Sequence, residues 1–89
     1  SLYSIDKNIE LKEIKLNLLK YDIEKLKELI KEQLRKTLKE RVKKLEDLVD
    51  SIKTREDFDL FLKKCDDFIS SLYNKKISEE CKKKILELI

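Results

Sequence analysis

The sequence contains no glycine, no proline and no alanine in its 89 residues. Gly and Pro are the residues that most often mark turns, and an average chain of this length has about six Gly and four Pro. Tight β-hairpins and phosphate-binding loops both need glycine where φ is positive. The lack of Gly therefore argues for long helices, joined by few turns in which Asn takes any left-handed position.

Histidine is also absent, which removes the commonest general base and a principal metal ligand. The remaining soft ligands, Cys65 and Cys81, are sixteen residues apart and include no CxxC pair, so they do not predict a zinc site. Neighbouring carboxylates such as Asp66 and Asp67 point in different directions on a helix and form no acid–base dyad. We therefore predict no enzyme: no catalytic residue, no metal, no cofactor and no small-molecule substrate.

No stretch of the chain approaches the roughly 20 apolar residues of a transmembrane helix, and the N-terminus lacks the features of a signal peptide. With 46% charged and 40% hydrophobic residues, the composition is too apolar for a disordered chain. We expect a soluble, intracellular protein without membrane contact and a single helical domain over residues 1–89. A fragment of a longer protein is also consistent with a chain that starts at Ser1 and has no Met.

Apolar residues recur at steps of three and four along the chain, the spacing of one face of a helix. The longest such run predicts one uninterrupted helix, capped by Asp22, whose apolar face comprises Ile23, Leu26, Ile30, Leu34, Leu38, Val42, Leu45, Val49 and Ile52. Thr54 followed by Asp57 is close to a capping box and predicts the start of the next helix. The buried stripe expected for that helix comprises Phe58, Phe61, Leu62, Cys65, Phe68, Ile69 and Leu72.

A short last helix is expected near the C-terminus. We predict that Asn74 ends the preceding helix in a left-handed conformation and that Ser78 caps the last one, with Glu79 and Glu80 in its first turn. Its expected buried residues are Ile77, Cys81, Ile85 and Leu88.

Residues 1–21 leave two alternatives open. Leu11, Ile14 and Leu18 have the spacing of a helix, whereas Ile14, Leu16 and Leu18 alternate as in a strand. We favour a helix, because a lone strand needs sheet partners and no other segment alternates.

Three to four helices with short connections predict an all-α fold, a small irregular antiparallel helical bundle with one long central helix. Part of that helix's apolar face is expected to stay uncovered, which predicts self-association or a helical partner. Cys65 and Cys81 lie on apolar faces and are expected as buried, reduced thiols. A disulfide between them is the alternative, although they lie at different distances from the turn between their helices.

Charge is distributed unevenly along the sequence. Residues 25–44 carry nine basic and three acidic side chains, whereas residues 45–69 carry four basic and eight acidic ones. In the basic part a side chain at every fourth position predicts a ridge along the long helix: Lys27, Lys31, Arg35, Lys39 and Lys43. Such a ridge is a candidate contact for an acidic protein or for phosphates, although a solvated helix face gives the same pattern. No aromatic platform for stacked bases accompanies it.

These patterns favour a non-enzymatic helical module for protein–protein interaction or assembly, such as an accessory subunit or adaptor. The alternative is a small nucleic-acid-associated protein that binds phosphates through the basic ridge.

Overall fold

The computed structural model describes residues 23–89, which form four α-helices and no strand. The helices are α2 (Ile23–Leu38), α3 (Lys43–Asp50), α4 (Arg55–Leu72) and α5 (Lys75–Glu87). The predicted all-α fold is confirmed. The two alternatives for residues 1–21, and the expected cap at Asp22, lie outside the described residues.

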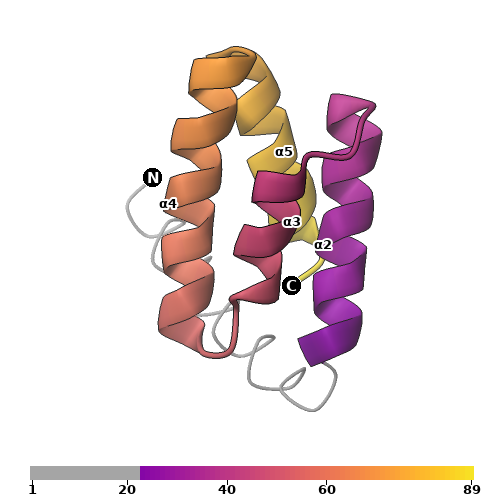
Figure 1. Ribbon diagram of the computed structural model, residues 1–89, viewed down its shortest axis with the longest axis vertical. Coiled ribbons are helices and arrows are strands. Elements are labelled where there is room, and N and C mark those ends of the chain that lie inside the picture. The colour runs from indigo at the N-terminus through magenta and orange to yellow at the C-terminus, as the bar shows by residue number, and fades with distance from the viewer. Residues whose placement is uncertain (1–22) are drawn as a thin grey trace.

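The four helices run alternately up and down and form a closed ring (Figure 1). Helix α2 packs on α3, α3 on α4, α4 on α5, and α5 on α2. The α2–α3 and α4–α5 connections lie at one end of the ring and the α3–α4 connection at the other (Figure 1). Because the helices range from 8 to 18 residues, the result is the irregular antiparallel bundle that was predicted.

The single helix predicted between Ile23 and Ile52 is wrong. Helix α2 ends at Leu38, and α3 begins only at Lys43. Lys39 takes up a left-handed conformation with φ of 62°, and its N–H donates to the Arg35 carbonyl at 2.7 Å. This is the usual helix-ending bond, although glycine usually occupies the position because a side chain there costs about 1–2 kcal/mol.

Packing explains why the chain turns at a position where the sequence gives no stop signal. Folding α3 back on α2 allows Leu45 and Val49 to be buried in the same core as Leu34 and Leu38. One straight helix would leave part of this apolar face without cover from the same chain. Burial of each large aliphatic side chain contributes about 1.5–3 kcal/mol, so several together outweigh the cost of a left-handed lysine.

The other helix starts show one correct and one wrong prediction. The Thr54 hydroxyl accepts from the Asp57 N–H at 3.1 Å, and the Asp57 carboxylate accepts from the Thr54 N–H at 3.1 Å, which confirms the capping box. Asn74, in contrast, is extended with φ of −167° and caps α5 by accepting from the Ile77 N–H at 2.8 Å. Ser78 is therefore not the cap. It lies within α5, where it is buried.

The core contains most of the apolar residues that the sequence predicts, together with both cysteines, which are free thiols. Three expected members of the α4 stripe lie at its edge: Leu62 and Phe68 are half-buried, and Leu72 is 59% exposed near the helix end. In α5 the predicted Ile77 and Leu88 are also only half-buried. The buried side chains of the core are Leu26, Ile30, Leu34, Leu38, Leu45, Val49, Ile52, Phe58, Phe61, Cys65, Ile69, Cys81, Ile85 and Ile89.

Candidate interaction surface

The first two residues of the predicted ridge hold α2 against the end of α3. The Lys27 side chain is buried, and its ammonium donates to the backbone carbonyl of Asp50 at 3.1 Å. The Lys31 ammonium lies 2.6 Å from the Asp50 carboxylate. Asp50 is the last residue of α3, where free carbonyls favour a nearby cation. Both lysines are therefore engaged within the bundle.

The contact between Lys31 and Asp50 also shifts both ionisation equilibria. The hydrogen bond from Lys31 lowers the pKa of Asp50. The same hydrogen bond raises the pKa of Lys31 above its ordinary value. Both groups consequently stay charged around neutral pH, and the attachment of α2 to α3 is insensitive to pH in that range.

The other three ridge residues surround the α2–α3 connection. Arg35 lies in the last turn of α2, Lys39 occupies the left-handed position, and Lys43 is the first residue of α3. All three are exposed, and the ion pair of Lys43 with Asp47 at 3.1 Å is on the surface. Since α2 ends at Leu38, the five residues do not form one line along a helix.

A larger basic surface forms where two connections meet. The Tyr73 hydroxyl donates to the Glu40 carboxylate at 2.6 Å, which joins the α4–α5 turn to the α2–α3 turn. Lys75 and Lys76 therefore lie at the same end of the bundle as residues 35–44 (Figure 1). We call this surface the cationic end; its residues are Arg35, Lys36, Lys39, Arg41, Lys43, Lys44, Lys75 and Lys76.

The spacing of residues in the sequence does not predict that Lys75 and Lys76 belong to this surface, because more than thirty residues separate them from the ridge. The packing of α5 on α2 and the hydrogen bond of Tyr73 with Glu40 bring the two segments together. Within residues 35–44 the cationic end has six basic side chains and a single acid, Glu40. Three of the six, Lys36, Arg41 and Lys43, form ion pairs with neighbouring acids outside this range.

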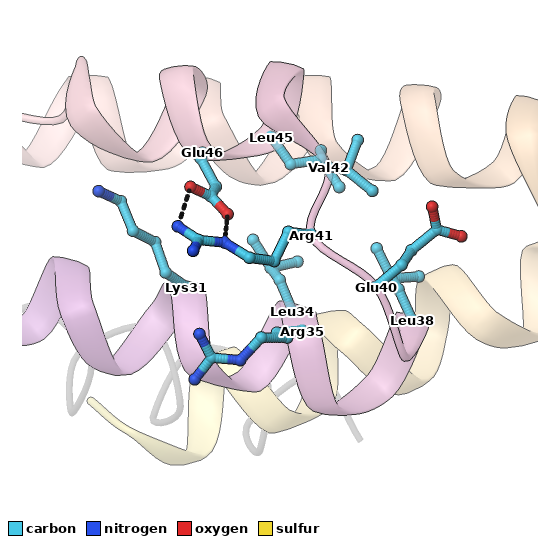
Figure 2. A pocket seen from close by; sticks show the side chains of 9 residues that line it. All are labelled: Lys31, Leu34, Arg35, Leu38, Glu40, Arg41, Val42, Leu45 and Glu46. Atoms are coloured by element: carbon cyan, nitrogen blue, oxygen red, sulfur yellow. Dashed lines mark hydrogen bonds and ion pairs between the residues drawn. The ribbon is translucent and has the colours of Figure 1, made fainter.

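A small crevice lies between α2 and α3 beside the connection (Figure 2). The Arg41 guanidinium donates two hydrogen bonds to Glu46, at 3.0 and 3.1 Å, and lowers the pKa of that carboxyl. Figure 2 shows Glu40 at the opposite end of the crevice from this ion pair. The cavity measures about 10 Å³, roughly the space of one water molecule. A cavity of this size between the charged groups is too small for a substrate.

A wider, open groove of about 470 Å³ runs between α3 and α4. Leu48 of α3 and Phe68 of α4, both half-buried, line it together with Lys44, Lys64, Asp67 and Ser71. The Lys44 ammonium lies 5.3 Å from the centroid of the Phe68 ring, a cation–π contact. We call this surface the α3–α4 groove. The apolar pattern did not predict this groove, because it places Phe68 in the core, and Leu48 lies beside the α3 stripe.

The two thiols are in surroundings that suppress reactivity. Burial raises the pKa of Cys65 to about 12 and that of Cys81 to about 11. Thiols with such values are protonated at neutral pH, and the protonated form is a poor nucleophile and metal ligand. Residues 23–89 also contain no group of three or more Cys, Asp or Glu side chains arranged to hold a metal ion.

None of the helices in the described part of the chain has both the length and the apolar character needed to cross a membrane. Comparison with known proteins gives no match to a family model, to a curated protein or to a solved structure. The function of this chain must therefore be inferred from the surfaces described above.

Proposed function

We propose that the protein is a non-enzymatic helical interaction module and that the α3–α4 groove binds an acidic amphipathic helix of a partner protein. The observation that carries this proposal is an apolar floor, formed by Leu48 and Phe68, with a lysine from each helix beside it, Lys44 and Lys64. Asp67 also lines the groove, so its three charged side chains leave a net charge of +1, although residues 45–69 as a whole carry more acids than bases.

Helices bind in grooves of this kind through apolar residues spaced by three and four. Such residues would cover Leu48 and Phe68, while carboxylates on the flanks of the same helix would pair with Lys44 and Lys64. The cationic end supports this choice of partner, because Lys44 belongs to both surfaces. Its field attracts acidic molecules from a distance and thereby accelerates association.

The environment of the reactive groups supports the non-enzymatic part of the proposal. Both thiols are buried and protonated, and the carboxylates of Asp50 and Glu46 are held in ion pairs with Lys31 and Arg41. The crevice at which charged groups converge has the volume of about one water molecule. A module that works by binding needs none of these groups to be free.

The test is a titration of the isotopically labelled full chain, followed by backbone amide chemical shifts. The probe is a helical peptide of about 18 residues, roughly five turns, with Leu on one face and Glu on its flanks. We expect shifts concentrated in residues 44–48 and 64–71. A peptide in which Lys replaces every Glu should bind about tenfold more weakly, because replacing attraction to Lys44 and Lys64 by repulsion should cost about 1.4 kcal/mol of binding free energy in total.

Charge reversal in the groove provides the matched control. The double variant Lys44→Glu, Lys64→Glu should lose the acidic peptide and gain affinity for the basic one. Lys83→Glu, Lys84→Glu makes the same change of charge on the exposed surface of α5, away from the cationic end, and should retain the preference of the wild type. Shifts that map to α5, or equal binding of both peptides, would refute the proposal.

The same titration with a DNA duplex tests the nucleic-acid alternative. Tighter binding of the duplex than of the acidic peptide, with shifts around Arg35, Lys39 and Lys75 and a steep loss of affinity with added salt, would replace the proposed function by phosphate binding at the cationic end.

A further inference from the structure

The α2–α3 connection is the part of the described chain whose backbone agrees least with its residues. Lys39 is the one residue of 23–89 with positive φ, at a position where a side chain crowds the following carbonyl. Helix α3 then begins after Val42, whose side chain offers no acceptor to the free N–H groups of the first turn. Neither the end of α2 nor the start of α3 has a local signal in the sequence.

The residues across this connection instead continue the pattern of a single helix. Lys39, Glu40 and Arg41 are all good helix formers, and Glu40 precedes Lys44 by four residues, the favourable order for a helical ion pair. The apolar positions also keep the spacing of one helix face: Leu34, Leu38, Val42 and Leu45. Local preferences therefore favour a straight helix through residues 39–42.

Packing of α2 against α3 and α5 keeps the turn folded. The contacts include Lys27 and Lys31 with Asp50, and the fully buried Ile30 in the common core. Straightening of the connection in an isolated molecule would expose Ile30 and its neighbours to water, which the hydrophobic effect opposes. One copy alone consequently stays folded back.

A second copy of the chain removes this obstacle, because it offers an identical site for α2. We infer that residues 39–42, the α2–α3 hinge, open in a reversible dimer in which two copies of this chain exchange α2. Each copy then has one continuous helix from α2 to α3, and its α2 lies on the α3 and α5 of the other copy. Such exchange is a known low-cost route to dimers when a short hinge straightens.

Every contact of α2 with α3 and α5 is made again between copies in the exchanged dimer, including those of Lys27 and Lys31 with Asp50. The dimer also releases Lys39 from its left-handed conformation and adds helical hydrogen bonds across the hinge. It loses the hydrogen bond between Tyr73 and Glu40 and the ion pair of Arg41 with Glu46, because residues five apart do not face each other on a helix. It also requires two molecules to meet. The balance between the two forms therefore depends on concentration and on the residue at position 39.

Substitution of Lys39 tests the role of the hinge. Lys39→Gly favours the left-handed turn by about tenfold per hinge, and a dimer has two hinges, so its dissociation constant should rise by about 100-fold. Lys39→Ala removes the same charge but disfavours that turn as lysine does, and it should change the constant by less than about threefold. Sedimentation equilibrium of the full chain up to millimolar concentration measures both effects.

Charge exchange across the α2–α3 contact distinguishes exchange of helices from ordinary association of surfaces. Lys31→Asp places two carboxylates together, and Asp50→Lys places two ammonium groups together. In an exchanged dimer of one Lys31→Asp copy and one Asp50→Lys copy, position 31 of each copy lies against position 50 of the other. Both contacts then pair a carboxylate with an ammonium group. Native mass spectrometry of the mixture should show more heterodimer than random pairing gives, whereas the double variant Lys31→Asp, Asp50→Lys should behave as the wild type.

Three results would overturn this inference. The first is a wild-type chain that stays monomeric at millimolar concentration. The second is an equal effect of Lys39→Gly and Lys39→Ala on dimerisation. The third is a mixture of the two charge variants with only the random share of heterodimer, because a dimer formed through outer surfaces leaves both repulsive contacts inside each copy.

Discussion

The two connections that flank α3 reverse the chain direction by different physical means, although neither contains glycine or proline. In the α3–α4 connection the Asp57 carboxylate accepts hydrogen bonds from the N–H groups of both Lys53 and Thr54, at 3.0 and 3.1 Å. The Ser51 hydroxyl donates to the Leu48 carbonyl at 2.7 Å. This turn is stabilised by side chains within a few residues of each other.

The α2–α3 connection has weaker local support, an exposed ion pair of Arg41 with Glu46. Lys39 is left-handed, and Val42 precedes α3 without a capping hydrogen bond from its side chain. The other contacts that hold this turn are distant in sequence: Lys27 with Asp50, and Tyr73 with Glu40. The comparison shows that one turn is encoded locally, whereas the other exists because the bundle packs around it.

The largest expected difference between the two turns is in the free energy of unfolding lost when the apolar residue next to each turn is truncated. Ile52 is fully buried beside the α3–α4 turn, so Ile52→Ala should lower the free energy of unfolding by about 3 kcal/mol. Val42 is half-buried beside the other turn, and Val42→Ala should cost about 1 kcal/mol. Urea unfolding followed by circular dichroism measures both. Equal losses would mean that the two turns are anchored alike.

Removal of the cap tests the local support of the α3–α4 turn. Thr54→Ala leaves the Asp57 N–H without its hydroxyl acceptor and should lower the free energy of unfolding by about 1 kcal/mol. Lys53→Ala, in the exposed residue just before it, should stay within about 0.5 kcal/mol of the wild type. The same urea titrations apply, and a Thr54→Ala variant as stable as the Lys53→Ala control would contradict a locally encoded turn.

Glycine should act in opposite directions in the two turns. Lys39→Gly removes the side chain from a left-handed position and should raise the free energy of unfolding of the monomer by about 1 kcal/mol. Lys53 does not have positive φ, so Lys53→Gly should lower it by about 0.5–1 kcal/mol through the greater freedom of the unfolded chain. Both are measured at low protein concentration, where association is negligible. A destabilising Lys39→Gly would show that lysine is suited to this turn.

The smallest expected effect is the titration of the contact between Tyr73 and Glu40. The hydrogen bond to Glu40 raises the pKa of Tyr73 to about 12, above the ordinary value of about 10. Its contribution to stability is therefore complete below pH 10 and disappears as the pH rises through 12. In an absorbance titration, Tyr73→Phe should remove the tyrosine with this high pKa, and Glu40→Gln should bring it back toward 10. If Tyr73→Phe removes a tyrosine that titrates near 10, the contact is not formed in solution.

The parts of the structure that the sequence predicted well depend on near neighbours. The capping box of Thr54 and Asp57 spans three residues, and the apolar stripe from Leu26 to Leu34 repeats within two helical turns. A prediction from such patterns needs only the local geometry of a helix. The same patterns do not decide between two candidate caps four residues apart, as the wrong assignment of Ser78 shows. Asn74 is an equally good cap, and Ser78 instead donates to Asp66 of α4 at 2.6 Å.

The candidate surfaces were predicted only in part, because each is made from residues of different helices. The prediction of a ridge from Lys27 to Lys43 depended on one straight helix, and the turn at Lys39 interrupts that helix. No pattern in the sequence places Lys44 beside Lys64, because α3 and α4 meet only through packing.

The sequence by itself determined that this chain is helical, which faces of its helices are apolar, and that positive charge gathers in its first half. These are properties of composition and of spacing within one helix. The tertiary structure decided where the chain turns between α2 and α3, which lysines are engaged by Asp50, and that Lys75 joins the basic residues of the distant hinge. The physical reason is that a left-handed lysine is unfavourable locally and is tolerated only because the turn buries apolar residues of α2 and α3 in a common core.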